Sequence, residues 1–245
     1  MNLTERIIKE CKKKNLHFSL LDPEDQSPEE AGKLAKTAEK LGTFAMMVGG
    51  STLGSSKQVD QTVKAIKENS NLPVILFPSG AKFLSKHADA IFFMSLLNSR
   101  NVDFVIREHV QGAPFVKHTG LEPISMGYLI IEPGMTAGKM GQVDLVKRDD
   151  IKSAVGYGLS TEFLGMNFFY LEAGSGAPEP VSNEMITSVS KSIKIPLVVG
   201  GGIRDAKTAK EKVKAGANII VTGTTFEKDK NLEKTLGEII KAIEE

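Results

Sequence analysis

The sequence has little that would cross-link a fold, span a membrane or attract nucleic acid. Its single cysteine, Cys11, excludes an intramolecular disulfide framework and a zinc site built from several cysteines. There is no run of about 18 apolar residues, and residues 1–6 carry no apolar signal region, so we expect a cytoplasmic chain without a transmembrane helix. Lys and Arg number 31 against 30 Asp and Glu, so the chain has almost no excess of positive charge. This balance indicates neither a broad nucleic-acid-binding surface nor a long-range electrostatic field that would attract anions. Any phosphate site must therefore be built locally.

What the sequence does contain is an alternation of short apolar runs with amphipathic stretches rich in Lys and Glu. The 245 residues are 41% hydrophobic and 25% charged, which is ordinary globular composition, and we predict one domain over residues 1–245. Near-continuous apolar strands are typical of parallel sheets buried on both faces. Eight strand–helix units in this length predict a single (β/α)₈ TIM barrel. The eight runs are residues 16–21, 44–48, 73–77, 90–94, 124–131, 167–171, 197–199 and 218–221.

The stretches between these runs indicate helices to different degrees. Residues 28–41 follow the helical period, with Ser27 as N-cap and Pro28 in the first turn. Residues 81–88 are too few for a full crossover helix, so we expect a reduced third helix. Residues 135–142 are polar and glycine-rich and predict a long loop on the active-site face, and an open doubly wound sheet is the alternative fold. Further helix candidates are residues 57–68, 101–111, 149–164, 206–215 and 232–243.

The most informative residues stand where the predicted strands end. Three glycines, residues 200–202, follow the seventh strand, and a Thr-Gly-Thr triplet, residues 222–224, follows the eighth. In barrels these two neighbouring loops commonly bind phosphate, because glycine lets backbone N–H groups approach the anion. The helix after Asp205 can add the positive end of its dipole. The pair of turns predicts a phosphate site, with tight turns that bind nothing as the alternative.

The sixth strand ends in residues 170–176, which offer hydroxyls, glycine N–H groups and the carboxylate of Glu172. A carboxylate beside a bound phosphate would repel it. Its better role is to accept a hydrogen bond or a proton from a hydroxyl of the ligand. This mixture of groups fits a small phosphorylated polyol, and a helix-capping or ion-paired Glu172 is the alternative.

A metal ion could be held at the ends of the first two strands. The first strand ends at Asp22 and the second in Gly49, Gly50 and Ser51, so the Asp22 carboxylate and the Ser51 hydroxyl should lie close together. One carboxylate and one hydroxyl cannot enclose an ion, but they can hold Mg²⁺ if a substrate diphosphate supplies further oxygens. Two local turn caps are the alternative.

Taken in order, these strand-end motifs resemble the geranylgeranylglyceryl phosphate synthase family, which includes the bacterial heptaprenylglyceryl phosphate synthases. Each motif is weak alone, whereas the ordered set covers nearly the whole chain and is specific. The motifs are His17-Phe18-Ser19-Leu20-Leu21-Asp22-Pro23, Val48-Gly49-Gly50-Ser51, Leu96-Leu97-Asn98-Ser99, Tyr170-Leu171-Glu172-Ala173-Gly174-Ser175-Gly176, Val199-Gly200-Gly201-Gly202-Ile203 and Val221-Thr222-Gly223-Thr224.

The resemblance implies a barrel with a degenerate third helix. It implies transfer of a geranylgeranyl group from its diphosphate to the 3-hydroxyl of sn-glycerol 1-phosphate, a step of ether-lipid synthesis. Glu172 would orient and deprotonate that hydroxyl, and Asp22 and Ser51 would bind Mg²⁺. We place the groove for the prenyl chain near the third and fourth strands, where a short third helix leaves room. The implied glycerol phosphate site comprises Tyr170, Leu171, Glu172, Ala173, Gly174, Ser175, Gly176, Gly201, Gly202, Gly223 and Thr224.

Leu20 departs from the pattern, because some members, including bacterial ones, carry a lysine two residues before the motif aspartate. The chain is in this respect similar to the largely archaeal branch, which suggests a homo-oligomer, dimer or hexamer. A lipid product would bring transient contact with a membrane surface. A different prenyl chain length, C35 in place of C20, stays open. The competing interpretations are a TIM-barrel isomerase or lyase acting on another sugar phosphate, and a phosphate-binding barrel without catalysis.

Overall fold

The strands form a closed parallel barrel in which each pairs with the next in the sequence and β8 pairs with β1. A computed structural model describes residues 1–50, 54–223 and 231–244. The predicted barrel is confirmed, and the open doubly wound sheet was wrong. The strands are β1 (Leu16–Leu21), β2 (Ala45–Val48), β3 (Val74–Leu76), β4 (Ala90–Leu96), β5 (Glu122–Ile130), β6 (Phe168–Glu172), β7 (Leu197–Gly200) and β8 (Ile219–Thr222).

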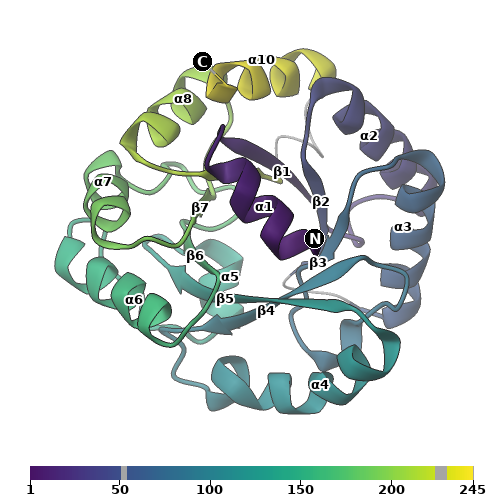
Figure 1. The fold of residues 1–245 in the computed structure, drawn as a ribbon, viewed down its shortest axis with the longest axis horizontal. Coiled ribbons are helices and arrows are strands. Elements are labelled where there is room, and N and C mark those ends of the chain that lie inside the picture. The colour runs from purple at the N-terminus through teal and green to yellow at the C-terminus, as the bar shows by residue number, and fades with distance from the viewer. Residues whose placement is uncertain (51–53, 224–230, 245) are drawn as a thin grey trace.

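Helices surround this barrel as a ring (Figure 1). In α2, Ser27 accepts the Glu30 N–H, Pro28 opens the first turn, and Gly42 ends the helix in the left-handed conformation (φ 99°). The α-helices described are α1 (Leu3–Cys11), α2 (Pro28–Leu41), α3 (Ser56–Asn69), α4 (Glu108–Thr119), α5 (Met135–Met140), α6 (Ile151–Phe163), α7 (Asn183–Ser192), α8 (Ala206–Ala215) and α10 (Leu232–Glu244). None of them is long and apolar enough to cross a bilayer.

The core has an inner and an outer layer because both faces of each strand are buried. Alternate strand residues, such as Phe18 of β1, Phe92 of β4 and Phe168 of β6, fill the barrel interior. The other faces pack against the helices, as Leu21 of β1 does against α2. This two-sided burial explains why the strands read as near-continuous apolar runs.

The third barrel helix is reduced to η1 (Ala81–Phe83), a single 3₁₀ turn between β3 and β4, so this prediction is confirmed. The helix predicted over residues 101–111 is displaced. It starts as a π-helical turn, η2 (Asp103–Arg107), and continues as α4 to Thr119. Gly112 and Pro114 read as helix breakers in the sequence. The helix α4 nevertheless continues through both, and Gly112 lies close to Leu84 and Ala81.

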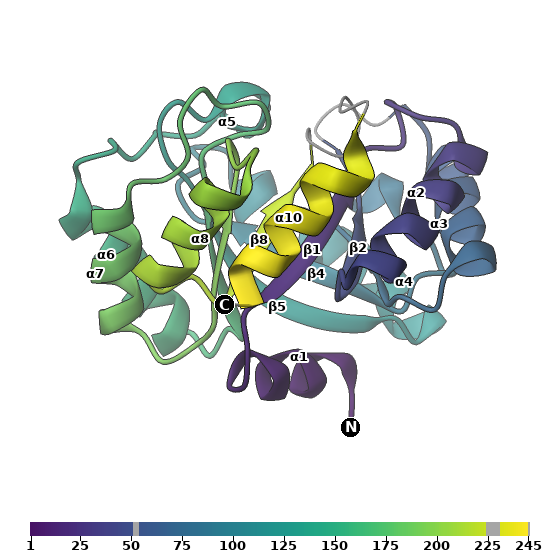
Figure 2. The same cartoon turned by 90° about the horizontal axis from the view of Figure 1, so that it is seen from above.

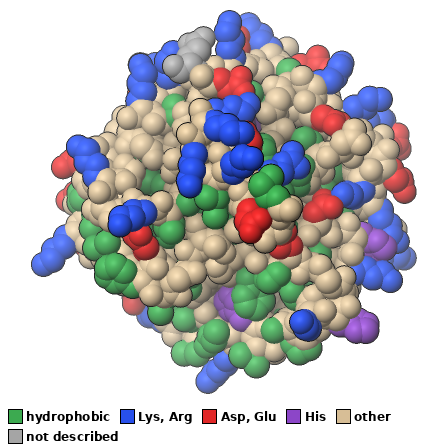
Figure 3. Space-filling view, in the orientation of Figure 1, with side chains coloured by type: hydrophobic (Ala, Val, Ile, Leu, Met, Phe, Trp, Pro, Cys, Tyr) green, Lys and Arg blue, Asp and Glu red, His purple; other side chains and the backbone are tan. Residues whose placement is uncertain are grey.

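Three helices were not predicted, namely α1, α5 and α7, and α7 begins after Ser182, whose side chain accepts the Met185 N–H as an N-cap. Residues 135–142, expected to be a loop, contain the helix α5. At the amino-terminal end of the barrel, α1 lies across the opening with Ile7 fully buried (Figure 2). The Glu122 carboxylate of β5 caps α1, because it accepts the backbone N–H groups of Leu3 and Thr4, both at 2.7 Å. Basic and acidic side chains are interspersed over this face (Figure 3).

Candidate active site

Glu172 ends β6 as a buried carboxylate, with 6% of its surface exposed. Its Oε1 accepts a hydrogen bond from the Gly174 N–H at 2.7 Å. Burial raises the pKa of Glu172, and the nearby Tyr170 hydroxyl and Gly174 N–H offset this rise only in part. A carboxylate whose proton affinity is increased in this way is suited to take a proton from a ligand hydroxyl.

Two buried tyrosines stand beside this carboxylate. Tyr128 of β5 and Tyr170 of β6 are paired in register, and their rings meet edge to face with centroids 5.1 Å apart. The Tyr170 hydroxyl lies near Glu172 without the geometry of a full hydrogen bond, and a Cβ atom at Gly200 would overlap that hydroxyl. Burial, and then the charge of Glu172, raise the pKa of both tyrosines well above the usual range. Both hydroxyls therefore stay protonated and can donate to a ligand.

A small polar pocket of about 40 Å³ lies at the ends of β6, β7 and β8. Gly201 and Gly202 have left-handed backbones (φ 83° and 73°), and a Cβ atom at Gly201 would overlap the Glu172 carboxylate. Glycine is required here by conformation and by space, and the glycine-rich lining suits a phosphate group. The pocket is lined by Leu20, Tyr170, Glu172, Ser175, Gly176, Gly201, Gly202, Ile203, Arg204, Val221, Thr222 and Gly223.

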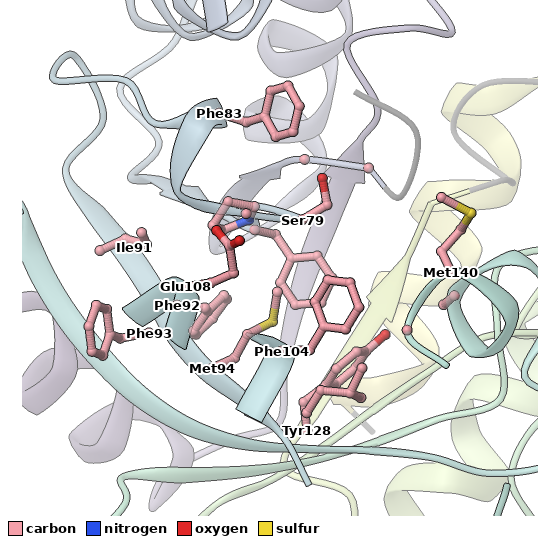
Figure 4. A pocket seen from close by; sticks show the side chains of 18 of the residues that line it. Ser79, Phe83, Ile91, Phe92, Phe93, Met94, Phe104, Glu108, Tyr128 and Met140 are labelled. Atoms are coloured by element: carbon pink, nitrogen blue, oxygen red, sulfur yellow. The ribbon is translucent and has the colours of Figure 1, made fainter. Parts of the chain in front are cut away.

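A larger cavity of about 660 Å³ adjoins this pocket and runs from residues 77–84, which follow β3, along β4 to α4. It lies where the sequence analysis placed an apolar groove, in the space left by the reduced third helix. Phe92, Phe104 and Met94 line its interior (Figure 4). Pocket and cavity share four lining residues, which are Leu20, Glu172, Ser175 and Gly223. A polar ligand and an apolar ligand bound in the two spaces would therefore meet beside Glu172.

Asp22 follows β1 at the edge of the large cavity and is half-buried. Its Oδ1 accepts the Glu24 N–H at 3.1 Å, and a Cβ atom at Gly50 would overlap its carboxylate. The structure thus places Asp22 against the residue before Ser51, while Ser51 itself lies outside the described residues. Burial raises the pKa of Asp22, and the negative charges of Asp25 and Glu24 act in the same direction. A cation at this place would be favoured by all three carboxylates.

Arg204 has a role that the sequence analysis missed. Its Nη2 donates to the carbonyl oxygens of Gly176 and Ala177 at 2.8 and 2.7 Å, so it fixes the loop after β6. Within the described part of the chain, it is the only Lys or Arg that lines either space. The one signal in the sequence was its position just before Asp205, the N-cap of α8.

His17 supports the end of β8 from outside the barrel. Its Nε2 lies 2.9 Å from the Thr222 hydroxyl and its Nδ1 lies 3.0 Å from the Thr43 hydroxyl. Burial lowers the pKa of His17 to about 3, so the ring is neutral. Over residues 1–50, 54–223 and 231–244, no group of three or more His, Cys, Asp or Glu side chains is placed to hold a metal ion.

Comparison with known proteins agrees with this geometry. A model of the PcrB family matches residues 6–243. This chain belongs to the PcrB family. A relative from Thermococcus sibiricus, named geranylgeranylglyceryl phosphate synthase, is 54% identical over 242 residues, which are 98% of this chain and 95% of the relative.

Solved structures of similar proteins have the same barrel. The (S)-3-O-geranylgeranylglyceryl phosphate synthase from Thermoplasma acidophilum, in complex with its substrate sn-glycerol-1-phosphate, superposes with a TM-score of 0.97 at 40% identity, covering 100% of this chain and 99% of that one. The wild-type enzyme from Thermoplasma volcanium gives a TM-score of 0.96 at 46% identity, covering 100% and 98%.

In this PcrB-family barrel, most of the predicted site residues come together. Leu171 and Ala173 do not face either space: their side chains pack in the outer core, so only their backbone is available to a ligand. Gly174 contributes its N–H to Glu172. Thr224, like Ser51, lies outside the described residues. The predicted residues that line the small pocket are Tyr170, Glu172, Ser175, Gly176, Gly201, Gly202 and Gly223, and Asp22 lines the large cavity.

Proposed function

We propose that this chain is a geranylgeranylglyceryl phosphate synthase, which joins geranylgeranyl diphosphate to the 3-hydroxyl of sn-glycerol 1-phosphate. The observation that carries the proposal is the buried Glu172 carboxylate, shared by a small glycine-rich pocket and a large apolar cavity. The names of the relatives, and the sn-glycerol-1-phosphate bound in a structure with the same fold, support it.

The chemistry follows from this placement. Glycerol phosphate binds in the small pocket with its 3-hydroxyl toward Glu172, and the prenyl chain lies in the apolar cavity. Glu172 accepts the hydroxyl proton as the oxygen forms a bond to C1 of the prenyl group. The bond from C1 to the diphosphate oxygen breaks, and its electron pair leaves with the diphosphate. Because the protein holds the hydroxyl and C1 next to each other, the reaction between the two substrates becomes effectively unimolecular and therefore faster.

A divalent cation fits the donor set at Asp22. The described lining of the large cavity contains Asp22 and Asp25 but neither Lys nor Arg, so a diphosphate there needs a cation to offset its charge. We propose that Asp22, together with Ser51 and diphosphate oxygens, holds Mg²⁺. Bound there, Mg²⁺ would neutralise charge on the leaving diphosphate.

One assay tests the reaction. The chain is incubated with Mg²⁺, geranylgeranyl diphosphate and labelled sn-glycerol 1-phosphate, in parallel with the labelled 3-phosphate enantiomer. We expect label to enter the organic phase with the 1-phosphate only. A parallel series with a C35 donor determines whether the longer chain is preferred. No transfer from either donor would reject the proposal and favour a barrel isomerase or lyase of another sugar phosphate.

We further propose that the chain forms a homo-oligomer. Val102, Ile106 and Val110 are exposed by 48%, 51% and 67%, and their spacing of four residues places them on one outer stripe of η2 and α4. Light scattering coupled to gel filtration would measure the mass, and a monomer would reject this proposal. Transient contact with a membrane and a cytoplasmic location stay predictions, which vesicle flotation and cell fractionation would test.

A further inference from the structure

The wall of the large cavity is unusual where the third helix is reduced. Residues 78–84 carry only the single turn η1, and this segment separates part of the cavity from the outside of the barrel. A full barrel helix would be held by its own ladder of hydrogen bonds. A single 3₁₀ turn has few such bonds, one of which joins the Phe83 N–H to the Gly80 carbonyl at 3.2 Å. Its position must be set by contacts from its neighbours.

Glu108, the first residue of α4, makes such a contact. Its Oε2 accepts the Ala81 N–H at 2.6 Å, a distance typical of a strong bond to a charged acceptor. A Cβ atom at Gly80 would lie 3.0 Å from the same oxygen, so the carboxylate packs directly on the backbone of this segment. Figure 4 shows the Glu108 side chain pointing toward the part of the chain that carries Ser79.

The surroundings of Glu108 make this bond strong. The partly buried side chain lines the same mostly apolar cavity as Phe92, Phe104 and Met94, where a hydrogen bond is electrostatically stronger than in water. One helical turn further along α4, Gly112 has no side chain, and a Cβ atom there would already touch Leu84 at 3.4 Å. The helix and the segment are therefore in close contact, and Glu108 supplies the directional bond that fixes their relative position.

We infer that Glu108 is a positioning residue that sets the width of the cavity and thereby the binding of the prenyl chain and the range of chain lengths accepted. It acts through the backbone of residues 80–84 and takes no part in the reaction at Glu172. The part of this inference that concerns the prenyl chain rests on the proposed function. The part that concerns the wall does not.

The claim that Glu108 fixes residues 80–84 of the cavity wall can be tested without an activity assay. Amide hydrogen exchange of the Ala81 segment is compared in the wild-type chain, Glu108→Gln and Glu108→Ala. The matched control is Glu184→Ala, which removes an exposed carboxylate from the first turn of α7. We expect faster exchange in Glu108→Ala, an intermediate rate in Glu108→Gln because its amide oxygen still accepts the Ala81 N–H, and the wild-type rate in the control. Unchanged exchange in Glu108→Ala would show that Glu108 does not hold the wall.

The effect of Glu108 on prenyl-chain binding is tested by steady-state kinetics on the same variants. For Glu108→Ala we expect KM for geranylgeranyl diphosphate to rise about tenfold, because binding of the prenyl chain must then order a segment that the lost hydrogen bond no longer holds. We expect kcat and KM for sn-glycerol 1-phosphate to stay unchanged. The rate with a C35 donor relative to the C20 donor should rise. Equal increases in both KM values would indicate general loosening and overturn the inference. An inactive wild-type chain would reject the proposed function and the prenyl part, while the exchange experiment still decides the role of Glu108 in the wall.

Discussion

Replacing Glu172 with glutamine should make the protein slower and, at high pH, more stable. The amide oxygen of glutamine can still accept the Gly174 N–H, which Glu172 accepts at 2.7 Å, so the loop after β6 keeps its anchor. What is lost is the group that accepts a proton. General base catalysis contributes about 100- to 10,000-fold, so we expect kcat to fall by that range with KM for sn-glycerol 1-phosphate little changed.

The gain in stability follows from the buried charge. Burial raises the pKa of Glu172 above its ordinary value of 4.5, so the folded protein keeps this proton to higher pH than the unfolded chain does. The stability that Glu172 contributes is fully present at pH values below the pKa of an ordinary glutamate. It is lost as the pH rises through the raised pKa of Glu172 in the folded protein. Each unit of the upward shift corresponds to about 1.4 kcal/mol of unfolding free energy, a cost that glutamine does not carry.

Two measurements decide this prediction. Urea unfolding at pH 8 should show Glu172→Gln to be more stable than the wild-type chain, and the difference should shrink toward pH 4. Label transfer at saturating substrates gives kcat, and the exposed Glu184→Gln serves as control in both. A variant that retains turnover within about tenfold would remove Glu172 as the base. No stability gain at pH 8 would contradict the argument from burial.

Three further predictions concern other parts of the structure. Gly50→Ala would push a methyl group into the Asp22 carboxylate, so the Mg²⁺ concentration for half-maximal activity should rise about 10- to 100-fold. An unchanged Mg²⁺ titration would argue against Asp22 as a ligand. Gly156→Ala in α6 should raise the unfolding free energy by about 1 kcal/mol, because the position is exposed with nothing within 4 Å of the new Cβ; a lower urea midpoint would contradict this. Burial lowers the pKa of His17 from an ordinary 6.5 to about 3, so the unfolded chain takes up a proton that the folded protein does not, and stability should fall as the pH drops from 6.5 toward 3. In a series of Tm measurements, His17→Gln should lose this acid dependence.

Much of the barrel could be predicted because its strands are short, apolar and regularly spaced. The reduced third helix was visible as a simple shortage of residues between two apolar runs. The helix α2 was predicted with its observed bounds, since Ser27, Pro28 and Gly42 provide both its cap and its end. The large cavity lies beside β4 and the segment after β3, near the strands where the sequence analysis placed an apolar groove, because a reduced helix leaves room there.

The elements that were missed depend on tertiary contacts. The helix α1 is held by Glu122, a residue more than a hundred positions further along the chain, although its local capping box of Asn2 and Glu5 was a signal that the sequence analysis missed. Residues 135–142 looked like a loop because of their glycines, yet Gly134 and Gly138 pack on Leu145 and allow α5 to form. The role of Arg204 depends on carbonyl groups of Gly176 and Ala177, and nothing local in the sequence reveals those partners.

The four residues shared by the small pocket and the large cavity also bear on how the protein would release its product. In the proposed reaction each substrate would occupy one of the two spaces. The ether product would occupy both at once. The product is thus a bivalent ligand: when its phosphate end dissociates, the prenyl end keeps it at high effective concentration beside the pocket, and the reverse holds as well. Turnover would then be limited by departure of the finished lipid, and the first reaction cycle would be faster than those that follow.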